Sequence, residues 1–164
     1  QPAHAAIVKE FGADMVQPDG YLDRKRLGAV VFSDPERRKR LEAITHPAIR
    51  TRWDRILRVY EEEAFAGIVF WDAALLYETG GARLMEKVVV VFTDPATQLA
   101  RLVARDGCTE AEARARVASQ LPVAEKAKLA DYVVDNSGPR AETERQVRAV
   151  HTALLRDLAA RGTR

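Results

Sequence analysis

The stretch KVVVVFTDPATQLARLVAR, residues 87–105, decides the fold class because it passes from an apolar run through a turn into a helical pattern. The run VVVVF, residues 88–92, is apolar throughout and rich in β-branched valine, as expected for a strand inside a sheet. The sequence PATQLARLVAR, which follows the turn, has the spacing of a helix. A buried strand that leads into a helix is the unit from which parallel sheets are built.

The alternation of strand and helix continues on both sides of this stretch. The runs GIVFWD, residues 67–72, and DYVVDNSG, residues 131–138, are predicted to contain two further strands. Helices are predicted at 109–121, which opens with a capping-box pattern, and at 141–162. We therefore expect an α/β fold with a parallel sheet and helices packed on it.

The first 66 residues show helical patterns only. A short helix is expected to stop at Gly12, and a second is expected after the Pro-Asp-Gly turn of residues 18–20. A third helix begins after Ser33 or Asp34, and a separate amphipathic helix is expected to open at His46-Pro47 and end near Gly67.

Composition narrows the class of protein. A chain of 164 residues with 47% hydrophobic residues suits one globular domain. Because 26 basic and 24 acidic residues nearly balance, nucleic acid is not an expected partner. The single cysteine, Cys108, allows no intrachain disulfide and fits a reducing compartment. No apolar run reaches the ~18 residues of a membrane span, so we expect no membrane partner and a cytoplasmic location.

Asp72 is an acid at the carboxyl end of a predicted buried strand, where α/β sheets bind ligands. Such a carboxylate can bind magnesium through water or orient an acceptor hydroxyl, although a helix cap or a loop hydrogen bond explains it equally well. Leu75, Leu76, Tyr77 and Glu78 form an apolar wall with an acid behind it. That wall suits core packing or a groove for a base or an extended ligand.

An arginine-rich region spans two predicted helices joined by the sequence DGCTE. Guanidinium groups on such a hairpin can neutralise charge on a transferring phosphoryl group, and a solvated charged face is the alternative. The polar side chains concerned are Arg101, Arg105, Arg114, Arg116 and Gln120.

Two smaller features are candidates for ligand contact. The loop DNSG, ending with Asn136, Ser137 and Gly138, offers an amide and open backbone for an adenine edge, or it is a plain turn. His46 caps a helix or touches a ligand. The three histidines show no metal-ligand spacing, so we predict no zinc site and no protein-held metal.

Taken in order, five segments resemble the dephospho-coenzyme A kinase family over essentially the whole chain. They are FGADMVQPDGYLDRKRLGAVVF, LEAITHPAIR, ALLYE, VVVVFTDPATQLARLVARDGCTEAEARARVASQ and KAKLADYVVDNSG. The resemblance implies a P-loop kinase that, with magnesium, transfers the γ-phosphoryl group of ATP to the ribose 3′-hydroxyl of dephospho-coenzyme A. This is the last step of coenzyme A synthesis.

The implied fold is a single three-layer domain with a parallel sheet. A helical substrate region would occupy residues 1–66 and a core residues 67–164, with a helical lid at about 101–128. The resemblance also assigns residues. Arg101 would be catalytic, and the nucleotide would contact Arg105, Asn136 and Gly138. The acceptor substrate would contact Asp72, Leu75, Leu76, Glu78 and His46.

The sequence departs from the family pattern in two ways. Ala74 stands where the family usually has proline, and Tyr77 where phenylalanine or valine is usual. The family also begins with a strand, a P-loop and a second strand with a catalytic aspartate, about 40 residues that hold the phosphates. No Gly-x-x-x-x-Gly-Lys-Ser/Thr motif occurs in the chain.

The missing motif predicts an inactive fragment without the first two strands, or a non-catalytic remnant. In the family the first of these strands lies between the segments that match IVFWD and KVVVVF. Two alternatives stay open: a P-loop kinase acting on another small molecule, and a non-catalytic module that binds nucleic acid through its arginines.

Overall fold

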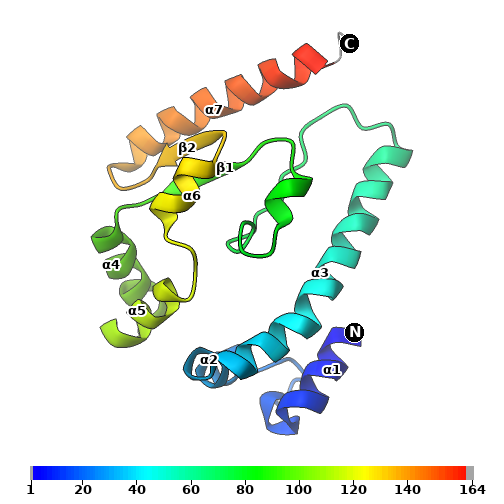
Figure 1. Cartoon of the computed structure of the whole chain (residues 1–164), viewed down its shortest axis with the longest axis vertical. Helices are drawn as coiled ribbons and strands as arrows, with labels where there is room; N and C mark the ends of the chain where they lie inside the picture. The colour runs from blue at the N-terminus through cyan, green and yellow to red at the C-terminus, as the bar shows by residue number, and fades with distance from the viewer. Residues whose placement is uncertain (1, 162–164) are drawn as a thin grey trace. The chain divides into compact units, whose positions relative to one another are not determined.

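The computed structural model describes residues 2–161, which form two compact units that divide between Ala66 and Gly67 (Figure 1). The last residue of the final predicted helix, Gly162, lies outside the described residues. Within the described range, none of the helices combines the length and the apolar character needed to cross a bilayer.

The first unit is helical, as predicted. Its elements are α1 (Pro2–Phe11), the 3₁₀ turn η1 (Ala13–Met15), α2 (Arg24–Ser33) and α3 (Pro35–Glu62). Their apolar faces meet in a small core, against which Leu41 and Ile44 of α3 pack. Ile7, Phe11, Met15, Leu27 and Val31 form this core.

Short polar side chains fix where these helices begin. The Asp23 carboxylate accepts a hydrogen bond from the Arg26 amide at the start of α2. Asp34, and not Ser33, caps α3 by accepting from the amides of Glu36 and Arg37. Each cap satisfies amides that have no partner inside the helix.

The predicted helix boundary at His46-Pro47 is wrong, because α3 runs through it as one helix of 28 residues with Pro47 inside. An internal proline lacks the N–H of one hydrogen bond and clashes with the preceding turn, but the bonds on either side still hold. The helix ends at Glu62, short of the predicted end near Gly67.

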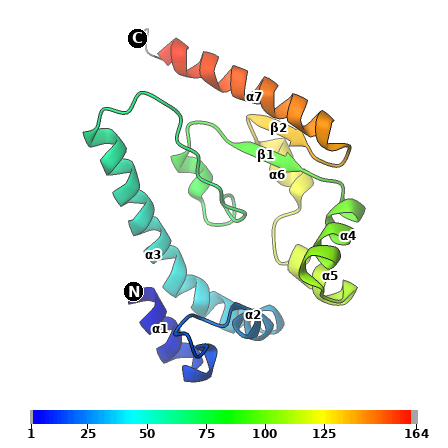
Figure 2. The same ribbon diagram turned by 180° about the vertical axis from the view of Figure 1, so that it is seen from behind.

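The second unit contains a parallel sheet with helices, as predicted. Strand β1 (Val89–Phe92) pairs with β2 (Tyr132–Asp135) in the register Val89↔Tyr132 to Phe92↔Asp135. The crossover between the strands contains α4 (Pro95–Asp106), α5 (Glu110–Ala118) and α6 (Val123–Leu129). After β2, α7 (Arg140–Arg161) returns along the sheet, as both views show (Figures 1 and 2).

The capping box predicted for α5 is present, with reciprocal hydrogen bonds between Thr109 and Glu112. The short helix α6 was not predicted, because its seven residues are too few to show a helical period. A 3₁₀ turn, η2 (Gly81–Leu84), precedes β1.

The strand predicted at GIVFWD is wrong for the described residues, in which 67–73 carry no strand assignment. A strand needs a neighbouring backbone with which to pair, and the sheet in residues 2–161 consists of β1 and β2 alone. Phe70, in the middle of this segment, is 64% exposed. The predicted three-layer arrangement therefore stays a prediction.

A polar cluster joins the amino ends of both strands to α7. The Asp131 carboxylate accepts hydrogen bonds from the Val88 amide at 2.8 Å and from Lys87 at 3.1 Å. The Tyr132 hydroxyl donates to Asp157 of α7 at 2.7 Å. The pKa of Asp131 is lowered, chiefly by the hydrogen bond from the Val88 amide. Burial opposes this, and the hydrogen bond and charge of Lys87 lower the pKa further.

The lowered pKa of Asp131 gives a prediction for stability against pH. The stability that Asp131 contributes should be complete above its unfolded pKa of about 3.9 and lost as the pH falls through its lower folded pKa. Asp131→Asn should cost about 1 kcal/mol of unfolding free energy at pH 7 and weaken this acid dependence. Urea unfolding between pH 2 and pH 7 measures both quantities.

Glu144→Gln is the matched control, because its partner Arg140 is 92% exposed and such a surface pair contributes little. Equal acid dependence in the wild type and in Asp131→Asn would contradict the prediction.

Candidate functional site

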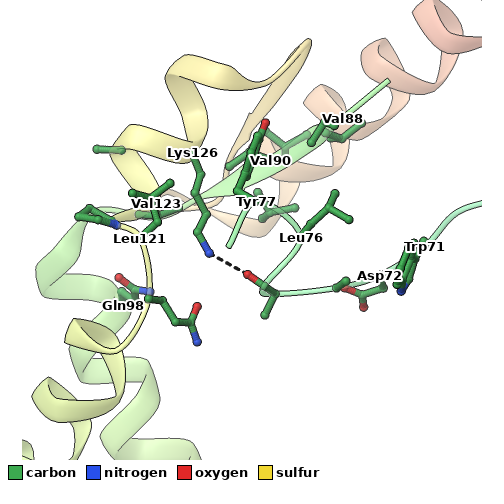
Figure 3. Close-up of a pocket in the computed structure, with 18 of the residues that line it drawn as sticks. Trp71, Asp72, Leu76, Tyr77, Val88, Val90, Gln98, Leu121, Val123 and Lys126 are labelled. Atoms are coloured by element: carbon green, nitrogen blue, oxygen red, sulfur yellow. Dashed lines mark hydrogen bonds between the residues drawn. The ribbon is translucent and has the colours of Figure 1, made fainter. Parts of the chain in front are cut away.

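The second unit contains a largely apolar cavity of about 1040 Å³ beside β1 (Figure 3). Its walls come from the segment 70–77, from β1, from the end of α5 and the start of α6, and from α7. This volume is close to the upper end of the range for small-molecule sites, about 1,000 Å³. Besides Trp71 and Tyr77, the polar side chains at its walls are Asp72, Gln98, Gln120, Lys126 and His151.

One wall of the cavity includes a turn that the sequence ALLYETG forms at residues 74–80. Leu76 and Tyr77 of this turn line the cavity, whereas Leu75 is not among the residues that line it. The turn closes on itself through a hydrogen bond from the Thr79 hydroxyl to the Leu75 carbonyl, at 2.8 Å. A Cβ at Gly81 would lie 2.9 Å from Cδ1 of Leu76, so a larger residue there would require the Leu76 side chain to shift.

Asp72 lies at the rim of the cavity and is the only carboxylate among the residues that line it. The residue is exposed, and its carboxylate has no hydrogen bond or ion pair with the described residues. It does not cap a helix, because turns and no helix follow it in residues 74–80. A ligand in the cavity can therefore reach this carboxylate without displacing a protein partner.

Glu78 connects the turn to the segment that enters α6. Its Oε1 accepts from the Leu121 amide at 2.9 Å and forms an ion pair with Lys126 Nζ at 2.7 Å. Lys126 also donates to the Ala74 carbonyl at 2.7 Å (Figure 3). Burial acts to raise the pKa of Glu78, but hydrogen bonds from Lys126 and from backbone amides outweigh it, so the pKa is lowered.

Sequence reasoning missed Lys126. In the run AEKAKLA it looks the same as Lys128, whose ion pair with Glu125 lies on the surface. Only the packing of α6 shows that Lys126 is buried, at 8% exposure.

Arg101 and Asn136, predicted separately, lie together. Arg101 Nη1 donates to the Asn136 carbonyl at 2.7 Å. The Asn136 side-chain oxygen accepts a hydrogen bond from the Thr143 hydroxyl at 3.0 Å. The backbone amide of Asn136 donates to the carbonyl of Phe92 at the end of β1. Gly138 stands in open space, since an added Cβ there would meet nothing within 4 Å.

The other predicted arginines lie on the hairpin of α4 and α5. Arg105 and Arg116 both contact the Asp106 carboxylate, at 2.7 Å and 2.6 Å. The hydrogen bond from Arg105 is the largest influence on the pKa of Asp106, which is lowered although burial opposes it. Arg114 pairs with Glu110 of its own helix. These guanidinium groups are thus already bound to carboxylates.

His46 lies half-buried in α3, within the first unit. Its predicted ligand contact stays a prediction. In the part of the chain that the structure describes, no group of three or more His, Cys, Asp or Glu side chains gathers as metal ligands do.

Comparison with known proteins finds one family throughout. A family model described as dephospho-CoA kinase matches residues 1–142. A dephospho-CoA kinase of Symbiobacterium thermophilum is 47% identical over 152 residues, covering 93% of this chain and 63% of that protein. One from Geobacter metallireducens is 49% identical, covering 91% of this chain and 74% of that protein.

Solved structures agree with these matches. The crystal structure of a Thermus thermophilus protein superposes with a TM-score of 0.67 at 34% identity, covering 93% of this chain and 80% of that one. The structure of a dephospho-CoA kinase from Campylobacter jejuni superposes with a TM-score of 0.59 at 30% identity, covering 90% of this chain and 73% of that one.

The Tyr77 hydroxyl gives a prediction, because it is buried without a hydrogen-bond partner in the described part of the chain. Its pKa is raised, first by burial and then by the charge of Asp131. Tyr77→Phe should leave the unfolding free energy unchanged or raise it by up to about 1 kcal/mol, since an unsatisfied buried group is removed. Denaturant unfolding measures the change.

Tyr132→Phe is the matched control, because it loses a hydrogen bond to Asp157 and should cost about 1 kcal/mol. Destabilisation of the Tyr77 variant to the same extent would mean that its hydroxyl has a partner.

Proposed function

The chain belongs to the dephospho-CoA kinase family, and from this we propose that its residues serve ATP-dependent phosphorylation of the ribose 3′-hydroxyl of dephospho-coenzyme A. The family match over residues 1–142 carries the proposal. The cavity with its unpartnered Asp72 carboxylate supports it, because an acceptor hydroxyl needs such an oxygen to orient it.

In this proposal the acceptor substrate occupies the cavity beside β1. Asp72 orients the 3′-hydroxyl, and the apolar wall of Leu76, with Leu75 behind it, binds the remainder of the ligand. Glu78 acts on the substrate through the turn that it holds. His46 keeps its assignment to the acceptor substrate, which follows from the family resemblance.

The nucleotide side is assigned to Arg101, Arg105, Asn136 and Gly138, with residues 101–128 as the lid. Arg101 now donates to a neutral carbonyl. A phosphate is a stronger partner for a guanidinium group because both are charged. The interaction of Arg101 therefore becomes stronger when the γ-phosphoryl group replaces that carbonyl, because negative charge develops on this group during transfer.

Magnesium is the metal that the family implies. Magnesium bound to nucleotide phosphates is held by one or two protein carboxylates, and the Asp72 carboxylate has no partner among the residues that the structure describes. When bound, the ion neutralises phosphate charge. Asp72 would contact the ion through water, in keeping with the prediction of no protein-held metal.

No Gly-x-x-x-x-Gly-Lys-Ser/Thr motif occurs in the 164 residues, so we propose that transfer needs a phosphate-binding segment in addition to them. In the proposed three-layer sheet its first strand pairs between segment 68–72 and β1. This placement accounts for a strand-like sequence that lacks a strand partner among the described residues.

A comparison of two chains tests the proposal. A longer chain, with a family-type segment joined before residue 1, should form coenzyme A from dephospho-coenzyme A and ATP. The 164 residues alone should form none and should unfold at a lower temperature, because the edge of β1 is left unpaired. Adenosine and pantetheine serve as competing acceptors. Activity of the short chain, or no preference for dephospho-coenzyme A, would contradict the proposal.

Arg101→Ala in the longer chain should lower the turnover number about 100-fold, since a lost contact to the transferring group costs about 3 kcal/mol. Its unfolding free energy should fall by less than about 1 kcal/mol, because the residue is exposed. Arg145→Ala, which removes a surface pair with Glu142, is the control and should change neither quantity. Unchanged turnover with a lowered melting temperature would make Arg101 structural.

A further inference from the structure

Lys126 is the one charged side chain that is buried in the described part of the chain. Burial of an ammonium group is unfavourable unless hydrogen bonds and an opposite charge compensate it. Both kinds of partner come from the same turn, the carbonyl of Ala74 and the carboxylate of Glu78, each at 2.7 Å. The ammonium group therefore fixes both ends of the stretch 74–78.

These contacts connect the turn to the arginine-bearing hairpin. Oε1 of Glu78, which pairs with Lys126, also accepts from the Leu121 amide, between the end of α5 and the start of α6. In Figure 3 the Lys126 side chain extends from α6 across the cavity wall to Ala74. Displacement of the α5 end from the turn would break this hydrogen bond to a charged acceptor, which also pairs with the buried Lys126.

We propose that Lys126 is a positioning residue. It fixes the position of turn 74–80, and with it the cavity wall that contains Asp72 and Leu76, relative to the segment that follows the hairpin α4–α5. The proposal rests on the proposed function, because it assigns the turn to the acceptor substrate. Lys126 itself does not touch the reacting atoms. Its effect on the reaction passes through the position of the turn.

A purely structural role makes a different prediction. Replacing a buried ion pair by apolar residues of similar volume is often neutral or stabilising, so a pair that only contributes to stability can be exchanged for hydrophobic residues. A pair that fixes the position of the turn cannot be exchanged in this way, because apolar side chains give the Ala74 carbonyl and the Leu121 amide no hydrogen-bond partner.

The test uses the longer chain of the preceding section and three variants. These are Lys126→Met, the conservative Lys126→Arg, and the double variant Lys126→Met with Glu78→Leu. Lys128→Met is the matched control, two residues further on in α6 with its side chain 69% exposed. Steady-state kinetics with each substrate varied, thermal unfolding, and hydrogen exchange of the amides in residues 74–82 are measured for all of them.

Lys126→Met should raise the KM for dephospho-coenzyme A about 10-fold or more, since a misplacement of about 1 Å can cost up to about 100-fold. The KM for ATP should stay within about 2-fold, because the turn is assigned to the acceptor substrate alone. Exchange at 74–82 should become faster. Lys126→Arg should restore part of the KM. The double variant should recover melting temperature without recovering the acceptor KM, and Lys128→Met should match the wild type.

The proposal would be overturned if the double variant recovered the wild-type KM for dephospho-coenzyme A together with the melting temperature. An unchanged KM for dephospho-coenzyme A in Lys126→Met would also overturn it. If the longer chain phosphorylates no acceptor, the proposed function fails, and hydrogen exchange alone then decides about Lys126. Equal exchange at 74–82 in the wild type and in Lys126→Met would in that case overturn the positioning role.

Discussion

The parallel pairing of β1 with β2 is the constraint on which the second unit depends. Its register aligns residues 43 positions apart and gives the two ends of the sheet different chemistry. At the carboxyl ends, the Asp94 amide donates to Ser137 and Arg101 reaches the Asn136 carbonyl. At the amino ends, Asp131 and Asp157 join both strands to α7. The candidate nucleotide contacts thus lie where parallel sheets place their ligands, and the opposite end is structural.

Sequence signals that act over a few residues predicted most of the helices and strands. Interactions with residues outside these short windows explain the errors. Valine runs, proline at a helix start and the Thr109 capping box act within a few residues, so the sequence alone reveals them. Whether residues 68–72 form a strand depends on a neighbouring strand with which their backbone can pair. The continuity of α3 through Pro47 likewise depends on hydrogen bonds that form on either side of the proline.

In the candidate site, too, some residues could be predicted from local sequence and others are visible only in the structure. Asp72 and Leu76 could be selected because a strand-like run ends beside them, and the structure places both at one cavity. The sequence indicates Tyr77 as part of an apolar wall and as a departure from the family, but only the structure shows that its hydroxyl has no partner among the described residues. Lys126 gave no local signal, since it differs from Lys128 only in the direction in which α6 presents it to the turn.

The two cations closest to the proposed chemistry are held in different ways, and this difference fits their assigned roles. Arg101 is exposed and donates to a neutral carbonyl, so a phosphate can take that place at little cost. Lys126 is buried against a carboxylate and a carbonyl, and separating these groups would leave a charge unpaired in a dry environment. A residue that must change partners during a reaction cycle needs the first arrangement. A residue that must keep a binding wall in place needs the second.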